Sequence, residues 1–140
     1  MKAMANFAKW IAAAAFAITL APFAAEAACT TAGQTLCLNA NRFSITTTWL
    51  NPYDGGSTGV GTPVQLTSDT GYFWFFNSAN VELIIKVLDG RAVNGKFWVF
   101  YGALSDVQYT ISITDTVTGT PKTYFNPGMT LSSKADINAF

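Results

Sequence analysis

The residue types that most often perform acid–base or metal chemistry are scarce in this sequence. It contains no histidine and only two cysteines, Cys29 and Cys37. Without histidine, Ser-His-Asp and Cys-His catalytic arrangements and His-based zinc sites are impossible. We therefore predict that the protein is not an enzyme and that it needs no metal and no cofactor.

The carboxylates do not suggest a catalytic pair either. A glycosidase needs two, one of them with a raised pKa, but Glu82 is the only glutamate after residue 27. Alternation predicts that Glu82 points outward beside Lys86 as a solvated pair. Asp69 and Asp89 adjoin turn residues, where aspartate usually accepts hydrogen bonds from local groups. The stretch "GVGTP" at 59–63 lacks the third glycine and the helix of a dinucleotide site, and "NPYDGGSTG" at 51–59 lacks the Asp-x-Asp spacing of a calcium loop.

Aromatic side chains offer the remaining chemistry, which is recognition. The stretch "GYFWFF" at 71–76 and the stretch "FWVFY" at 97–101 are rich in large rings. In extended chains, successive side chains point to opposite faces. Five rings then lie on strand faces that do not have to point into the core. We predict that these five are ligand-binding residues: Tyr72, Trp74, Phe76, Trp98 and Phe100.

The elements that must position these rings are predicted to be strands. Apolar and polar residues alternate with a period of two after the N-terminal segment, between Gly, Pro, Asn and Asp. A long loop is expected at 51–63, and a hairpin connection at 89–95, where Asp-Gly and Asn-Gly occur. We predict an all-β antiparallel sandwich of immunoglobulin-like size, with about seven strands at 42–50, 64–67, 72–76, 81–88, 96–104, 108–116 and 122–125.

A two-layer sandwich buries only the inner face of each sheet, so the aromatic strands leave large rings on the outside. Each exposed ring costs about 2 kcal/mol relative to burial, and something should cover it. The cover could be the chain itself, namely the N-terminal segment, the loop at 51–63 or the last residues. It could equally be a ligand.

The first 27 residues are predicted to be a secretory signal peptide. Residues 1–9 contain Lys2 and Lys9 and no acid, an apolar run of about a dozen residues follows at 10–20, and the sequence Ala-Glu-Ala at 25–27 suits cleavage after Ala27. The mature domain would be 28–140, secreted or periplasmic, with a disulfide between Cys29 and Cys37. A lipid anchor on Cys29 is the competing interpretation, but Glu26 occupies the position where a lipobox has an aliphatic residue, so no stable membrane anchor is expected.

Charge argues against nucleic acid as a partner. The sequence has eight basic and eight acidic residues, and removing Lys2, Lys9 and Glu26 leaves six against seven. Nucleic acids and anionic membrane surfaces both require clustered Lys or Arg. The remaining charges are scattered singly along the chain.

Several stretches resemble a β-domain that recurs in secreted bacterial proteins. They are "CLNANRFSITTTW", "LTSDTGYFWFFNSANVELIIKVLDGRAVNGKFWVFYGALSDVQYTISITDTVTGTPKTYFNP" and the closing "ADINAF". The resemblance spans nearly all of 37–140. It implies export, an all-β fold and a domain that folds by itself, and it supplies no catalytic residues.

Together these observations predict a non-catalytic exported module that binds a protein partner, or associates with itself, through an aromatic β-face. The first alternative is a carbohydrate-binding module, because Trp and Tyr rings stack on sugars. The second is an inhibitor of an extracellular enzyme that presents the loop at 51–63 or 89–95.

Overall fold

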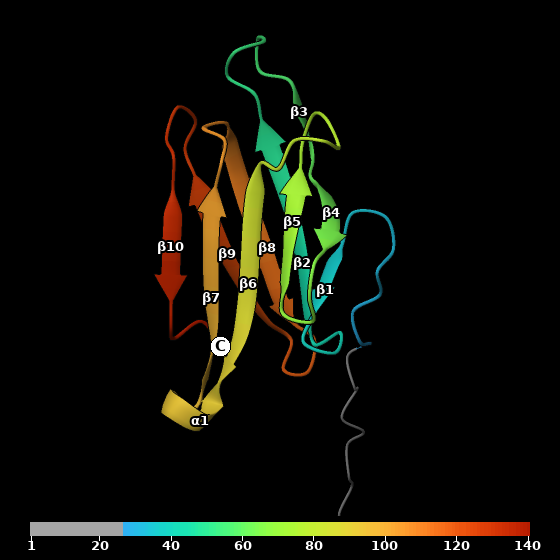
Figure 1. The fold of residues 1–140 in the computed structure, drawn as a ribbon, viewed down its shortest axis with the longest axis vertical. Coiled ribbons are helices and arrows are strands. Elements are labelled where there is room, and N and C mark those ends of the chain that lie inside the picture. The colour runs from blue at the N-terminus through green and yellow to red at the C-terminus, as the bar shows by residue number, and fades with distance from the viewer. Residues whose placement is uncertain (1–26) are drawn as a thin grey trace, which may run out of the picture.

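The computed structural model describes residues 27–140, which fold into two antiparallel sheets packed face to face (Figure 1). The predicted all-β sandwich is confirmed, although ten strands form rather than about seven. The predicted leader at 1–27 lies outside the described residues except for Ala27. Within the described part, no helix is long and apolar enough to cross a membrane.

Sheet A contains five strands in the order β1-β2-β8-β9, with β3 also paired to β2. The small strands β1 and β3 share one edge of β2, because β1 pairs with its first half and β3 with its second. The other edge of β2 pairs with β8 over eight residues. The bounds are β1 Leu36–Leu38, β2 Phe43–Leu50, β3 Thr58–Val60, β8 Gln108–Asp115 and β9 Thr120–Asn126.

Sheet B also contains five strands, in the order β10-β7-β6-β5-β4. Its centre is the predicted hairpin β6–β7, whose connection contains the single helical turn α1 (Arg91–Asn94). Gly95 ends α1 at φ 76°, a left-handed conformation that favours glycine. The bounds are β4 Thr62–Gln65, β5 Thr70–Trp74, β6 Leu83–Gly90, β7 Lys96–Ala103 and β10 Ser133–Asp136.

Alternation along the strands builds the core. Phe43, Ile45 and Thr47 are fully buried on the inner face of β2, as the sequence predicts, and Trp49 packs at the edge of the same cluster. Leu83, Ile85 and Val87 of β6 face them from sheet B. The chain passes from sheet A to sheet B at Gly61, where a Cβ atom would lie 3.1 Å from the Phe75 ring.

The predicted disulfide joins Cys29 to Cys37, whose Cα atoms are 5.7 Å apart. Cys37 lies in β1 and is buried together with Cys29. The bridge thereby fixes the residues that precede β1 to the edge of sheet A. A loop this short contributes about 2.5 kcal/mol in the chain-entropy view.

Three strands were not predicted: β1, β3 and β10. Each has three or four residues, lies at the edge of its sheet and pairs with a single neighbouring strand. Because β3 and the start of β4 fall within 51–63, the irregular part of that predicted loop is only 51–57.

The prediction for Glu82 is wrong. Its exposed fraction is 4%, because β6 begins only at Leu83 and Glu82 precedes the regular alternation. Its backbone N–H donates to Phe73 and its carbonyl accepts from Leu104. The side chain accepts a hydrogen bond from the Asn80 amide, so Glu82 ties the top of sheet B together and forms no pair with Lys86.

Candidate docking surface

The outer face of sheet B carries the aromatic residues in cross-strand rows. Strand register and the pleat place Tyr72 beside Ile84 and Val64, and Lys86 beside Phe100 and Thr70. Trp98 is opposite Leu88, and Trp74 is opposite Thr62. We call this surface the sheet B face; its residues are Thr62, Val64, Thr70, Tyr72, Trp74, Ile84, Lys86, Leu88, Trp98, Phe100, Gly102, Ser133 and Ala135.

Four of the five predicted ligand-binding residues lie on the sheet B face. Tyr72, Trp74, Trp98 and Phe100 are all half-buried there. Phe76 is separate, because β5 ends at Trp74. Its ring is 47% exposed and packs edge-on against Trp49, 4.8 Å between centroids, at the end of the sandwich.

Trp98 is held in a fixed orientation. Its indole lies against Gly90 so closely that a Cβ atom on that glycine would be 2.1 Å from the ring. The indole Nε1 donates to Asn94 Oδ1 at 2.8 Å, and the ring meets Phe100 edge-on at 6.4 Å. The rings therefore cover each other in part, which is why they are less exposed than isolated side chains would be.

No segment of residues 27–140 covers the sheet B face. In Figure 1 the strands β5, β6 and β7 lie in front with nothing crossing them. The C-terminal residues, one expected lid, instead return to the core: Phe140 packs on Phe43 and its backbone pairs with Phe97. Within the described chain, these rings are thus covered only by their neighbours on and beside the same face, such as Phe100 and Asn94 around Trp98.

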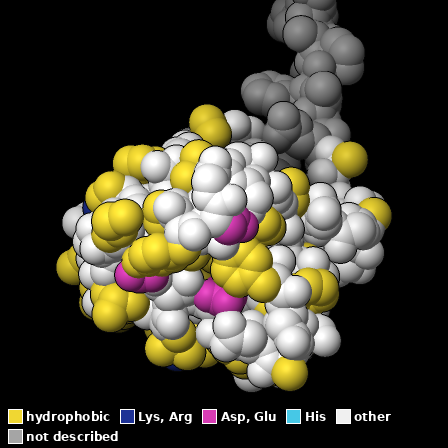
Figure 2. All heavy atoms as spheres, turned by 90° about the horizontal axis from the view of Figure 1, so that it is seen from above, with side chains coloured by type: hydrophobic (Ala, Val, Ile, Leu, Met, Phe, Trp, Pro, Cys, Tyr) yellow, Lys and Arg dark blue, Asp and Glu magenta, His cyan; other side chains and the backbone are white. Residues whose placement is uncertain are grey.

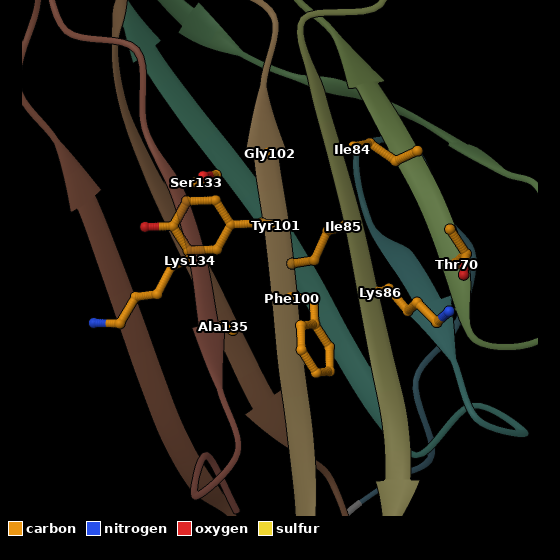
Figure 3. A pocket seen from close by; sticks show the side chains of 10 residues that line it. All are labelled: Thr70, Ile84, Ile85, Lys86, Phe100, Tyr101, Gly102, Ser133, Lys134 and Ala135. Atoms are coloured by element: carbon orange, nitrogen blue, oxygen red, sulfur yellow. The ribbon is translucent and has the colours of Figure 1, made fainter.

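The sheet B face has a hollow at its centre, of about 570 Å³ (Figure 3). Ile84 and Phe100 stand on either side, and Lys86 lies next to Thr70 at one flank. This volume falls within the range typical of ligand pockets. We call it the Gly102 hollow; its lining residues are Thr70, Ile84, Ile85, Lys86, Phe100, Tyr101, Gly102, Ser133, Lys134 and Ala135.

The missing side chain of Gly102 creates the hollow, although the backbone conformation at this position does not require a glycine. A Cβ atom there would touch only Ile84 Cγ2, at 3.9 Å, and the residue does not have a positive φ. Glycine in the middle of a strand weakens it and often marks a place where another molecule approaches closely. Gly102 therefore leaves space on the strand surface that another molecule could enter, and no sequence pattern indicated this.

Lys86 is the charged residue beside the hollow, and a second lysine of the same outer face, Lys96, lies at the far end of β7 opposite Gly90. The ion pairs of the described chain lie elsewhere, between Arg42 and Asp115, Arg91 and Asp89, and Lys122 and Asp136. Lys134 points the other way, with its ammonium 5.3 Å from the centre of the Tyr124 ring. Around the hollow, the face is consequently apolar with one positive charge, that of Lys86.

Asp69 and Asp89 behave as the turn residues that the sequence predicts. Asp69 accepts hydrogen bonds from the hydroxyls of Thr67 and Thr70, which hold its pKa below the ordinary value, with a small contribution from Lys86. Asp89 accepts from the backbone and guanidinium of Arg91, and its pKa falls to about 2. Among residues 27–140, no group of three or more acidic or cysteine side chains could hold a metal ion.

Comparisons with protein-family models, with curated proteins and with solved structures found no match to this chain. The geometry of the sheet B face therefore carries the functional argument.

Proposed function

We propose that the protein is an exported, non-catalytic binding module that docks a protein partner on the sheet B face. The observation that supports this most directly is the Gly102 hollow, an apolar depression flanked by rings and uncovered within residues 27–140. Hot spots of protein interfaces are typically aromatic anchors around a pocket that receives one bulky side chain. The disulfide fits an oxidising compartment.

The chemistry of the hollow indicates what the partner should present. Ile84 and Phe100 favour an apolar side chain between them, and Lys86 favours a carboxylate next to it. A partner segment with a bulky apolar residue beside Asp or Glu satisfies both requirements.

A selection from a random peptide library displayed on phage tests this proposal. We expect the exported protein to enrich peptides that combine a bulky apolar residue with Asp or Glu. The variant Gly102→Trp fills the hollow and should abolish their binding, and Phe100→Ala should weaken it about 10-fold. Ser112→Trp is the matched control, because Ser112 is an exposed strand residue on the outer face of sheet A.

Peptides that bind wild type and Gly102→Trp equally well would overturn the proposal. Selection that yields no enriched sequence would do the same. Circular dichroism on each variant confirms that the fold is retained before binding is compared.

Trp98 supports carbohydrate binding as a second candidate function. Its indole is fixed by Gly90 and Asn94 and half-buried, and a fixed ring on a sheet surface is suited to stacking on a sugar. Affinity electrophoresis in gels that contain polysaccharides distinguishes the two. Retardation that is lost in Trp98→Ala but kept in Gly102→Trp would favour the sugar and contradict docking in the hollow.

A further inference from the structure

We propose that the partner of the sheet B face is a second copy of this chain, which docks with its loop end. The loop end consists of the four connections that meet at the upper end of the sandwich in Figure 1: 51–57, 75–82, 104–107 and 127–132. The inference rests on the proposed function, since it names the partner of the same hollow.

The loop end presents protruding apolar side chains. Leu104 is 71% exposed, Leu131 70% and Met129 68%. Met129 also has a φ of 62°, a left-handed conformation that is uncommon for a residue other than Gly, Asn or Asp. Such strain persists where surrounding structure enforces it, and it is concentrated at functional sites.

The charges of the two surfaces are complementary. The loop end carries two solvent-accessible carboxylates, Asp54 and Asp106, and no Lys or Arg, whereas the third acid of these loops, Glu82, is buried. Figure 2, which looks down on this end, shows acidic side chains between apolar ones, with basic side chains only at the margin of the view. The sheet B face contains Lys86 and no acid. An apolar acidic surface and an apolar basic one therefore occur on the same molecule.

The loops of this end are tied to each other, so the surface is formed before docking. The Tyr53 hydroxyl donates to Asp106, and the backbone N–H of Met129 donates to the Asp106 carbonyl at 2.6 Å. Leu104 N–H donates to the Glu82 carbonyl at 2.8 Å. Preorganised loops lose little conformational entropy on binding.

The contact joins two different surfaces, so it is heterologous. After one copy docks its loop end in the hollow of another, the pair still has one free loop end and one free hollow. Such contacts grow into open chains, or close into rings when the rotation permits. Association should then continue beyond the dimer as concentration rises.

Sedimentation velocity on the exported product of the full chain tests the inference. We expect the average mass of wild type to rise past that of a dimer between about 5 µM and about 500 µM, a range that suits a weak interface. Gly102→Trp fills the hollow, and Leu104→Lys replaces an exposed apolar side chain of the loop end with a positive charge. Each variant alone should remain a monomer. Val117→Lys is the control, because Val117 is 68% exposed at the opposite end of the sandwich, and it should associate like wild type.

An equimolar mixture of Gly102→Trp and Leu104→Lys gives the decisive result. Each variant retains the surface that the other has lost, so the mixture should form a one-to-one complex that does not grow. A mixture that stays monomeric, association that Leu104→Lys does not affect, or a wild type that is monomeric at every concentration would each overturn the inference. If wild type is monomeric but still binds acidic-apolar peptides in a Gly102-dependent way, the proposed function stands and only the second copy as partner is excluded.

Discussion

Arg42 and Asp115 form the most enclosed ion pair of the described chain, at the lower end of the core. The guanidinium donates to both carboxylate oxygens, at 2.9 and 2.7 Å, and lies 4.3 Å from the centre of the Phe97 ring. Two parallel hydrogen bonds to a charged acceptor are stronger than neutral ones. The pair joins the start of β2 to the end of β8.

Asp115→Asn should lower the free energy of unfolding by about 2 to 3 kcal/mol at neutral pH, because the half-buried Arg42 guanidinium loses its buried counter-charge. Urea unfolding followed by circular dichroism measures this. Asp89→Asn is the matched control: it also removes an aspartate paired with an arginine, but that side chain is 44% exposed, so solvent screening should leave a smaller change.

The same pair gives the stability a dependence on pH. Burial alone would raise the pKa of Asp115 and is the largest single influence, but the Arg42 guanidinium and the Val117 N–H together outweigh it, so the pKa lies below its ordinary value of 3.8. A carboxyl whose pKa is lower in the folded state than in the unfolded state stabilises the fold. This stabilisation is complete above the unfolded-state pKa and is lost as pH falls through the folded-state pKa. The difference between wild type and Asp115→Asn should therefore shrink below about pH 4. A difference that stays constant down to about pH 2 would contradict this.

Two buried tyrosines should respond oppositely to loss of the hydroxyl. The hydroxyl of Tyr124 donates to Asp136 at 2.8 Å, whereas that of Tyr109 approaches Ser132 without forming a hydrogen bond of good geometry among residues 27–140. Burial is the largest cause of the raised pKa of both, to about 12 for Tyr109. Tyr124→Phe should cost about 1.5 to 3 kcal/mol, and Tyr109→Phe should be neutral or stabilising. Equal losses in denaturant midpoint would show that Ser132 is a full hydrogen-bond partner of Tyr109.

At the scale of the strands, two glycines of the sheet B surface provide a contrast. Gly102 has room for a methyl group, whereas Gly90 lies under the Trp98 indole. Gly102→Ala should raise the free energy of unfolding by about 0.5 to 1 kcal/mol, because alanine restricts the unfolded chain and suits a strand better. Gly90→Ala should lower it by about 1 to 3 kcal/mol, because the indole must move. Thermal unfolding of both variants measures the signs, and a stability loss in Gly102→Ala would mean that the glycine has a structural role.

The long strands could be predicted from sequence because their alternation is regular and each has a buried face. The alternation in 42–50 and 108–116 locates β2 and β8 to within a residue. The edge strand β10, with the sequence "SKAD", has no alternating pattern, and its order comes from pairing with β7, more than thirty residues away. Local pattern cannot reveal such long-range pairing.

The candidate site was predictable only in part, for a related reason. The pleat alone places Tyr72, Trp74, Trp98 and Phe100 on an outer face. The Gly102 hollow depends on the cross-strand register that puts Gly102 between Ile84 and Ser133, and the sequence does not specify that register. Likewise, Phe76 leaves the face because β5 ends two residues earlier, and strand ends are the least certain feature of a pattern.

For the molecule as a whole, both sheets depend on one core. The chain passes between them repeatedly, from β3 to β4, from β7 to β8 and from β9 to β10. Its last residue pairs with sheet B at Phe97 and packs on sheet A at Phe43. Separation of the sheets would expose the inner face of each, including fully buried Ile45, Ile85 and Ile111.

We therefore predict that the two sheets unfold in a single transition. Trp49 reports on sheet A and Trp98 on sheet B, so variants that keep only one of them in the mature chain, with the other positions changed to Phe, give a separate fluorescence signal for each sheet. Their denaturant midpoints should each coincide with the midpoint from circular dichroism of the same variant, as in a two-state domain. If the Trp98 signal changed at lower denaturant than circular dichroism, sheet B would be able to open alone. The sheet B face would then not be the rigid docking surface that binding in the hollow requires.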